Sequence, residues 1–195
     1  MRRVVLANFK GLPALMILDV QKGFDDPYWG SRNNEQAEAN IARLLKEWRN
    51  NNGRIIYSQH LSVQPQSPLH YKNKIGIQFK EIVQPKSTEK IIQKNVNSAF
   101  IGTSLETYLQ EQQIEELLIT GLSTQHCVST TTRMCGNLGY TTFLVADATA
   151  AFEITDHNGV LYSAEAIHNH ELAMLQKEFA TILTTDEIIS ELKSL

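Results

Sequence analysis

The feature that most constrains the fold of this chain is the regular alternation of short apolar runs with helical patterns. Such alternation is typical of α/β proteins, in which helices cover a largely parallel sheet. An apolar run such as "ALMILDV" predicts a buried strand. The expected strands lie at residues 14–20, 54–59, 89–94, 114–120, 141–147 and 180–185.

Helical patterns occupy the segments between these runs. Residues 35–53 carry an apolar stripe and end at Gly53, a residue suited to a helix C-cap, so they predict an amphipathic helix. Further helices are expected at 103–112, after Gly121, at 160–178 and from Thr185 onward. No repeat or Gly/Ser linker interrupts the pattern, so residues 1–195 are expected to form one domain.

One long polar segment departs from this alternation. Residues 60–88 contain Pro65, Pro68 and Pro85 and show no helical or strand periodicity. Loops of this length usually shape a binding site or an interface. We therefore expect the segment to do one or the other.

The composition excludes several classes of partner. The net charge is -3 and no cluster of Lys or Arg is present, so a nucleic-acid partner is not expected. No apolar run approaches the roughly 20 residues that cross a bilayer, so no membrane association is expected. On one helix, Cys127 and Cys135 would lie about 12 Å apart, beyond the reach of a disulfide. Both thiols are therefore predicted to be free, as is usual in the cytoplasm, which is the expected location.

Three reactive side chains stand at predicted strand ends. Asp19 closes the first strand, Lys94 closes the third, and Cys127 lies just past the fourth. Each alone has a structural explanation, because Asp19 can cap a turn, Lys94 can be solvated and Cys127 can be a small buried residue. A parallel sheet, however, gathers its strand ends at one edge, where ligands bind. Together the three predict a nucleophilic site.

The chemistry of such a site follows from the thiol. A free cysteine has a pKa near ~8.5, so only a few per cent is thiolate at neutral pH. A helix N-terminus and the ammonium of Lys94 are expected to favour the thiolate of Cys127. Asp19 can then take the thiol proton and pass it to a leaving amine. Backbone amides around residues 123–127 can hold an oxyanion.

Three motifs carry a resemblance to a known family. In order, "ILDVQKGF", "KNVNSAF" and "GLSTQHCVSTTTR" resemble the isochorismatase-like cysteine hydrolases, which include nicotinamidase and N-carbamoylsarcosine amidase. The resemblance covers almost the whole chain. It implies a three-layer α-β-α sandwich with a six-stranded, mainly parallel, Rossmann-like sheet, and an Asp19–Lys94–Cys127 triad. It also implies a cis peptide at Leu122–Ser123, an oxyanion hole formed by the amides of Ser123 and Cys127, and a homo-oligomer such as a dimer or tetramer.

The metal-binding motif of the nicotinamidase-type members is altered in this chain. In "SQHLSVQPQSPLH", His60 stands where the first metal-binding residue, an Asp, would be, and Ser62 stands where a His would be. His60 and His70 do not supply the three ligands that a divalent metal usually needs. His168 and His170, two positions apart, do not share a helix face. We therefore expect no metal and no other cofactor.

The resemblance to metal-free members implies hydrolysis of a small amide or ureido substrate through a thioester on Cys127. Two alternatives stay open: a catalytically silent small-molecule-binding or assembly protein of the same fold, and ether hydrolysis of the isochorismatase type. The latter reaction does not use the family cysteine. A redox role is disfavoured because the chain has no CxxC, and a nucleotide site because it has neither GxGxxG nor GxxxxGK[ST].

Several residues are predicted to contact the substrate. Phe24 and Trp29 can form an aromatic wall, or else a lid or subunit contact. His60 is expected to line the pocket. Gln21 can bind substrate or brace its turn, and Phe100 can lie near the site or in the core. His126 is adjacent to the nucleophile, but neighbouring helix positions do not face each other, so a role outside the pocket is expected for it.

Overall fold

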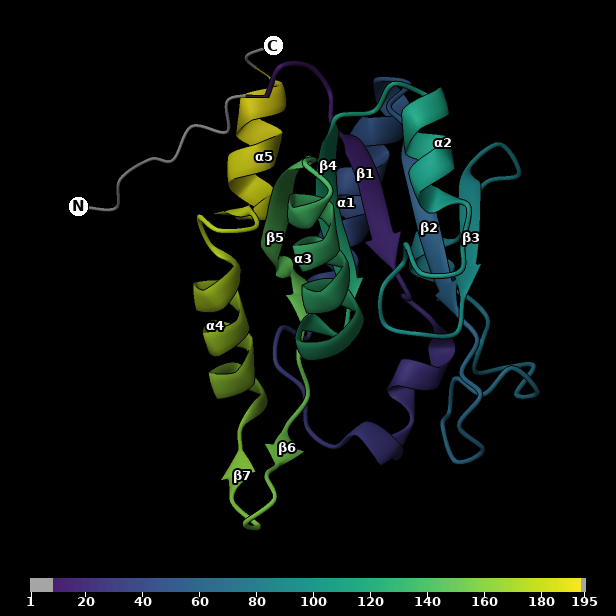
Figure 1. Ribbon diagram of the computed structural model, residues 1–195, viewed down its shortest axis with the longest axis vertical. Coiled ribbons are helices and arrows are strands. Elements are labelled where there is room, and N and C mark those ends of the chain that lie inside the picture. Colours follow the sequence, from purple (N-terminus) through teal and green to yellow (C-terminus); the bar gives the residue numbers. More distant parts are fainter. Residues whose placement is uncertain (1–8, 194–195) are drawn as a thin grey trace.

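A computed structural model describes residues 9–193, and its centre is a six-stranded sheet with the order β3-β2-β1-β4-β5-β8 (Figure 1). Every adjacent pair of strands in this sheet is parallel. The strands are β1 (Ala14–Leu18), β2 (Ile55–His60), β3 (Lys90–Lys94), β4 (Glu116–Leu122), β5 (Thr141–Ala150) and β8 (Thr181–Leu183). The predicted α/β fold with a mainly parallel sheet is confirmed.

Helices cover both faces of the sheet and give the three layers. On one face pack α1 (Ala37–Asn50) and α5 (Thr185–Leu192), and on the other pack α2 (Leu105–Glu111), α3 (Ser129–Asn137) and α4 (Ala164–Leu175). Successive strand side chains point to opposite faces, so β1 contributes to both cores. Leu15 and Ile17 lie in the core beneath α1, and Met16 and Leu18 lie in the core beneath α2 and α3.

The structure differs from the predicted boundaries around β4 and β5. Strand β4 continues to Leu122, β5 continues to Ala150, and their register shifts between Ile119 and Gly121. Gly121 has a φ of 123°, and a Cβ there would lie 2.1 Å from the carbonyl oxygen of Leu18. Only glycine suits this position, where the chain leaves the sheet toward Cys127.

The predicted helix at 160–178 is shorter than expected. Its first residues instead join a projecting two-stranded hairpin, β6 (Ile154–Thr155) and β7 (Leu161–Tyr162), and α4 begins only at Ala164 (Figure 1). Ser163 forms the helix N-cap, because its side chain accepts from the amide of Ala166. Between residues 9 and 193, no helix has the length and apolar character needed to traverse a bilayer.

Candidate active site

The sheet brings the three predicted residues together at its carboxyl edge. Asp19 directly follows β1, Lys94 is the last residue of β3, and Cys127 lies in a π-helical turn, Thr124–Val128, that joins β4 to α3. The Nζ atom of Lys94 is 2.6 Å from Oδ2 of Asp19 and 3.1 Å from Sγ of Cys127. The side chains of Asp19 and Lys94 are 0% exposed, so this ion pair is withdrawn from water.

Backbone geometry and a neighbouring strand hold Asp19. Its φ of 53° turns the chain sharply away from β1. The hydroxyl of Ser58 on β2 donates to Oδ1 at 2.6 Å, while Oδ2 faces Lys94. Oδ1 therefore has a hydrogen-bond partner, and Oδ2 has an ion-pair partner.

The ammonium of Lys94 has two more contacts. Its Nζ lies 3.2 Å from the carbonyl oxygen of Val96 and 3.0 Å from Nδ1 of His60. Burial acts to lower the pKa of Lys94, but the charges of Asp19 and Cys127 outweigh it and raise the pKa above its usual value. Lys94 is thus a protonated lysine at the centre of the site.

The thiol of Cys127 differs from the expectation. Burial, and next the charge of Asp19, raise the pKa of Cys127 despite the opposing effect of Lys94. Lys94 lowers the pKa of the thiol as predicted, but burial and the neighbouring carboxylate outweigh it, because Cys127 is only 6% exposed. A proton transfer from Cys127 to Asp19 would remove the negative charge that disfavours the thiolate and leave it paired with Lys94.

The donor atoms of three side chains are close enough to suggest a metal site. One ligand atom from each of Asp19, His60 and Cys127 lies within 4.8 Å of the others. The ammonium of Lys94, however, is within 3.1 Å of all three side chains. A metal bonded at about 2.0–2.3 Å to the same atoms would overlap Nζ. These residues therefore do not fit a metal ion while Lys94 is in place.

A cavity of about 260 Å³ opens onto Cys127. Phe24 and Trp29, both predicted pocket residues, form one wall with ring centroids 4.9 Å apart. The indole N–H of Trp29 donates to the carbonyl of Gly23 at 2.8 Å, which fixes the ring. The cavity is lined by Phe24, Tyr28, Trp29, His60, Ser62, Gln64, Ser67, Leu69, Asn97, Ser123, His126 and Cys127.

Two predicted substrate contacts lie elsewhere. The amide of Gln21 donates to the carbonyls of His60 and Ile77 and accepts from the N–H of His60, so it braces the turn after β1. Phe100 packs in the core with α2 and α3 and faces Tyr140 at 6.1 Å. Neither residue lines the cavity. The amide of Gln21 is hydrogen-bonded to backbone groups, and the ring of Phe100 packs against core side chains.

Two residues close to Cys127 in the sequence, Ser123 and His126, also line the cavity. His126 does so against the sequence expectation, because the π-helical turn directs adjacent side chains differently from a regular α-helix. Burial lowers the pKa of His126. Ser123 follows a cis peptide bond with Leu122.

Most of the polar residues that line the cavity were not predicted from the sequence. Ser62, Gln64 and Ser67 come from the 60–88 segment, and Asn97 comes from the loop after β3, with its Oδ1 3.9 Å from the Cys127 sulfur. These loops have no periodicity from which side-chain direction can be inferred. The only available signal was the unusual length of the 60–88 segment.

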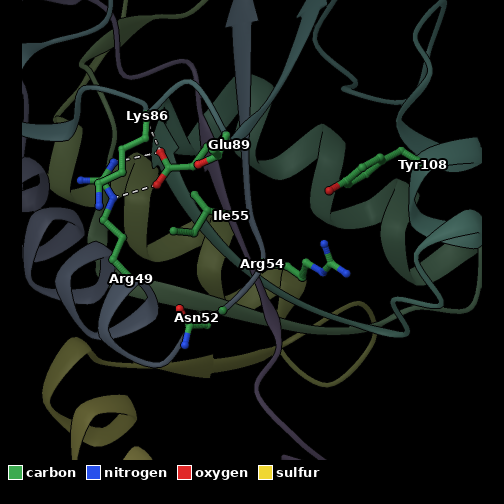
Figure 2. A pocket seen from close by; sticks show the side chains of 9 residues that line it. Arg49, Asn52, Arg54, Ile55, Lys86, Glu89 and Tyr108 are labelled. Atoms are coloured by element: carbon green, nitrogen blue, oxygen red, sulfur yellow. Dashed lines mark hydrogen bonds and ion pairs between the residues drawn. The ribbon is translucent and has the colours of Figure 1, made fainter.

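A second hollow, of about 290 Å³, lies at the opposite end of the sheet (Figure 2). It is bordered by the starts of β2 and β3, and Arg49 forms a two-point ion pair with Glu89 inside it. Arg54 and Tyr108 lie across from that pair (Figure 2). Its lining has no nucleophile within the described residues comparable to Cys127 and belongs to the amino edge of a parallel sheet. The carboxyl edge is therefore the candidate active site.

The chain is similar in sequence and in fold to known proteins. A sequence model of the isochorismatase domain family matches residues 13–187, which include all three triad positions. The isochorismatase family protein YrdC of Bacillus subtilis (strain 168) is 56% identical over 178 residues, covering 91% of this chain and 95% of that protein. Nicotinamidase 3 of Arabidopsis thaliana is 29% identical over 100 residues, covering 51% of this chain and 45% of that protein.

Solved structures agree with these sequence matches. A crystal structure of an isochorismatase-family protein from Chromobacterium violaceum ATCC 12472 has a TM-score of 0.91 at 38% identity, over 96% of this chain and 97% of that one. The crystal structure of an isochorismatase from Pseudomonas putida KT2440 has a TM-score of 0.79 at 31% identity, over 90% and 89% of the two chains.

Proposed function

The chain belongs to the isochorismatase family of hydrolases, and from this premise we propose that it cleaves a C–N bond in a small amide or ureido compound through a cysteine thioester. The observation that carries the proposal is the contact of one buried ammonium with both a carboxylate and a thiol. Lys94 reaches Asp19 at 2.6 Å and Cys127 at 3.1 Å. The partial match to Nicotinamidase 3 also supports an amide as the bond cleaved.

The first half of the reaction forms the thioester. Asp19 takes the proton from the Cys127 thiol, and the thiolate, paired with Lys94, attacks the carbonyl carbon. The amides of Ser123 and Cys127 donate to the oxyanion of the tetrahedral intermediate. The C–N bond then breaks as Asp19 returns its proton to the nitrogen, and the amine or ammonia leaves.

The second half regenerates the enzyme. Asp19 takes a proton from a water molecule that attacks the thioester carbonyl, and a second tetrahedral intermediate forms. Its collapse breaks the C–S bond, and the proton returns from Asp19 to the Cys127 sulfur. The acid leaves, so the net reaction consumes one water per C–N bond.

The test is ammonia release from a panel of small amides and ureido compounds, combined with mass spectrometry of acid-quenched enzyme. We expect an acyl adduct on Cys127, loss of turnover in Cys127→Ala, and retention of turnover in Cys135→Ala. Cys135 is the matched control because it is a buried free thiol in the core, away from the cavity. Ammonia release that persists in Cys127→Ala would overturn the mechanism. Wild-type protein that binds panel members without turnover would favour the silent binding protein.

A further inference from the structure

The charges around the cavity limit which substrates the site can accept, and this inference rests on the proposed hydrolase function. We propose that the substrate is an uncharged, planar amide or ureido compound, and that a substrate carrying a carboxylate is selected against. The inference comes from the residues that surround the substrate, whereas the proposed function comes from the triad itself.

The cavity wall has no fixed charge. Within the described part of the chain, none of its lining residues is a lysine, arginine, aspartate or glutamate. Its two histidines are His60 and His126, and for both burial is the largest effect on the pKa and lowers it. For His60 the neighbouring ammonium of Lys94 lowers the pKa further. Both imidazoles are therefore neutral at physiological pH.

The cations near the cavity are already engaged. Lys94 is surrounded by Asp19, Cys127, His60 and the carbonyl of Val96. The formal charges of Asp19 and Lys94 cancel, and transfer of the Cys127 proton to Asp19 leaves the triad neutral, with Lys94 paired to the thiolate. A substrate carboxylate would therefore lose its hydration in a cavity that offers it no cationic partner.

Two cations behind the aromatic wall, Arg32 and Lys80, are also held in ion pairs. Arg32 stacks at 5.9 Å on the ring of Phe152, which itself stacks on Phe24. Its two terminal nitrogens donate to the two carboxylate oxygens of Glu38 at 2.7 and 3.0 Å. Lys80 donates to the same carboxylate at 2.7 Å. Neither cation is free to turn toward the cavity.

The shape of the wall favours a flat compound. Phe24 and Phe152 are stacked with an interplanar angle of 13°, and Trp29 is tilted against both. Flat π-systems pack on such a surface in offset-stacked or edge-to-face arrangements. Neutral donors and acceptors from Ser62, Gln64 and Asn97 complete the lining. These groups suit an amide or ureido group, which has both an N–H and a carbonyl.

The experiment compares probes that differ only in charge. Terephthalamide and 4-carbamoylbenzoate have nearly the same shape, and N-carbamoylglycinamide with N-carbamoylglycine provides a ureido pair. We would measure kcat/KM for ammonia release, corrected for the two amides of terephthalamide and, from the product mass, for ammonia released by the carboxamide of N-carbamoylglycinamide. We would also measure the protection of Cys127 from iodoacetamide by each probe. We expect the uncharged member of each pair to be preferred by at least about tenfold.

A pair of variants supplies the control for charge. Gln64 lines the cavity, is exposed, and makes no side-chain hydrogen bond within residues 9–193. Gln64→Lys adds a cation at the cavity and should reduce the preference several-fold, whereas Gln64→Met, of similar length, should keep it. Parallel behaviour of the two variants would overturn the role of charge.

The outcomes separate this inference from the proposed function. Equal or faster release from the carboxylates overturns the inference and leaves the hydrolase function standing. Protection of Cys127 by terephthalamide alone, without ammonia from any probe, supports the preference and removes the proposed function. No protection and no ammonia from any probe overturns both.

Discussion

The ammonium of Lys94 lies 3.0 Å from Nδ1 of His60, and this contact fixes the state of the histidine. Because an ammonium only donates, Nδ1 must accept, and the ring proton of the neutral imidazole resides on Nε2. Within the described residues Nε2 has no hydrogen-bond partner, and the ring lines the cavity. His60 therefore presents an N–H donor to a bound molecule while its other nitrogen contacts the triad.

This arrangement predicts different effects for two substitutions at His60. His60→Asn keeps an acceptor near the Nδ1 position but removes the donor, and His60→Gln places an amide N–H near the Nε2 position. We expect His60→Asn to lower kcat/KM by about tenfold, the value of one lost hydrogen bond, and His60→Gln to retain more activity. The measurement is ammonia release from an amide that the wild type cleaves. Equal kinetics for the wild type and His60→Asn would contradict the assigned role.

Removal of the central ammonium is expected to damage both stability and turnover. Lys94→Met leaves the carboxylate of Asp19 buried without its ion-pair partner, which typically costs about 3–5 kcal/mol. We expect urea denaturation to show this loss and kcat/KM to fall at least about a hundredfold. Lys90→Met is the matched control, because Lys90 lies on the same strand and contacts the ring of Tyr108 instead of the triad. A similar loss in both variants would point to a general effect on β3.

Cysteine alkylation separates the two charges that act on Cys127. Asp19 raises and Lys94 lowers the pKa of the thiol. At a fixed pH near 8, Asp19→Asn should therefore speed the reaction of Cys127 with iodoacetamide, and Lys94→Met should slow it. Both variants should nevertheless lose hydrolysis. Asp19 also transfers the proton, and Lys94 pairs with the thiolate that attacks the substrate. Peptide mass spectrometry from pH 6 to 10 measures the rates.

Cys135 provides the internal reference for that experiment. It is fully buried, and burial raises its pKa to about 12. It should stay unmodified in every folded variant. Rapid labelling of Cys135 would show that a variant had lost its fold, and unchanged Cys127 rates in both variants would contradict the electrostatic account.

The stability of the protein should fall in acid through Glu38. Burial alone would raise the pKa of Glu38, but its hydrogen bonds with Arg32 and Lys80 outweigh burial and lower the pKa to about 2. A carboxyl whose folded pKa lies below the unfolded value of 4.5 stabilises the protein above that value. This contribution is lost as the pH falls from 4.5 toward 2.

The expected loss from Glu38 is about 2 kcal/mol of unfolding free energy between pH 7 and pH 3. Urea titrations of the wild type and Glu38→Gln at both pH values measure it as a difference, so that other carboxylates cancel. The variant should be less stable at pH 7 and should lose less stability on acidification. Parallel acid losses in the two proteins would show that Glu38 is not responsible.

The sequence predicted the strand ends better than the cavity. Asp19, Lys94 and Cys127 were placed correctly at one edge because buried strands are visible as apolar runs and parallel strands align their ends. The directions of Gln21 and Phe100 were not predictable, since both depend on which backbone carbonyls and rings lie nearby in the folded chain. The raised pKa of Cys127 was also missed, because burial depends on the whole surrounding structure and not on the adjacent residues.

Among the described residues, strand β3 has a single hydrogen-bonded neighbour, β2, and forms one border of the sheet. Asp19 and Cys127 follow strands β1 and β4 in its interior, but Lys94 arrives only with this border strand. The thiol therefore has its cation only while β3 is paired with β2. Local detachment of this border strand would separate Lys94 from Cys127 while the interior strands before Asp19 and Cys127 stayed paired, so the arrangement of the site depends on the pairing at the border of the sheet.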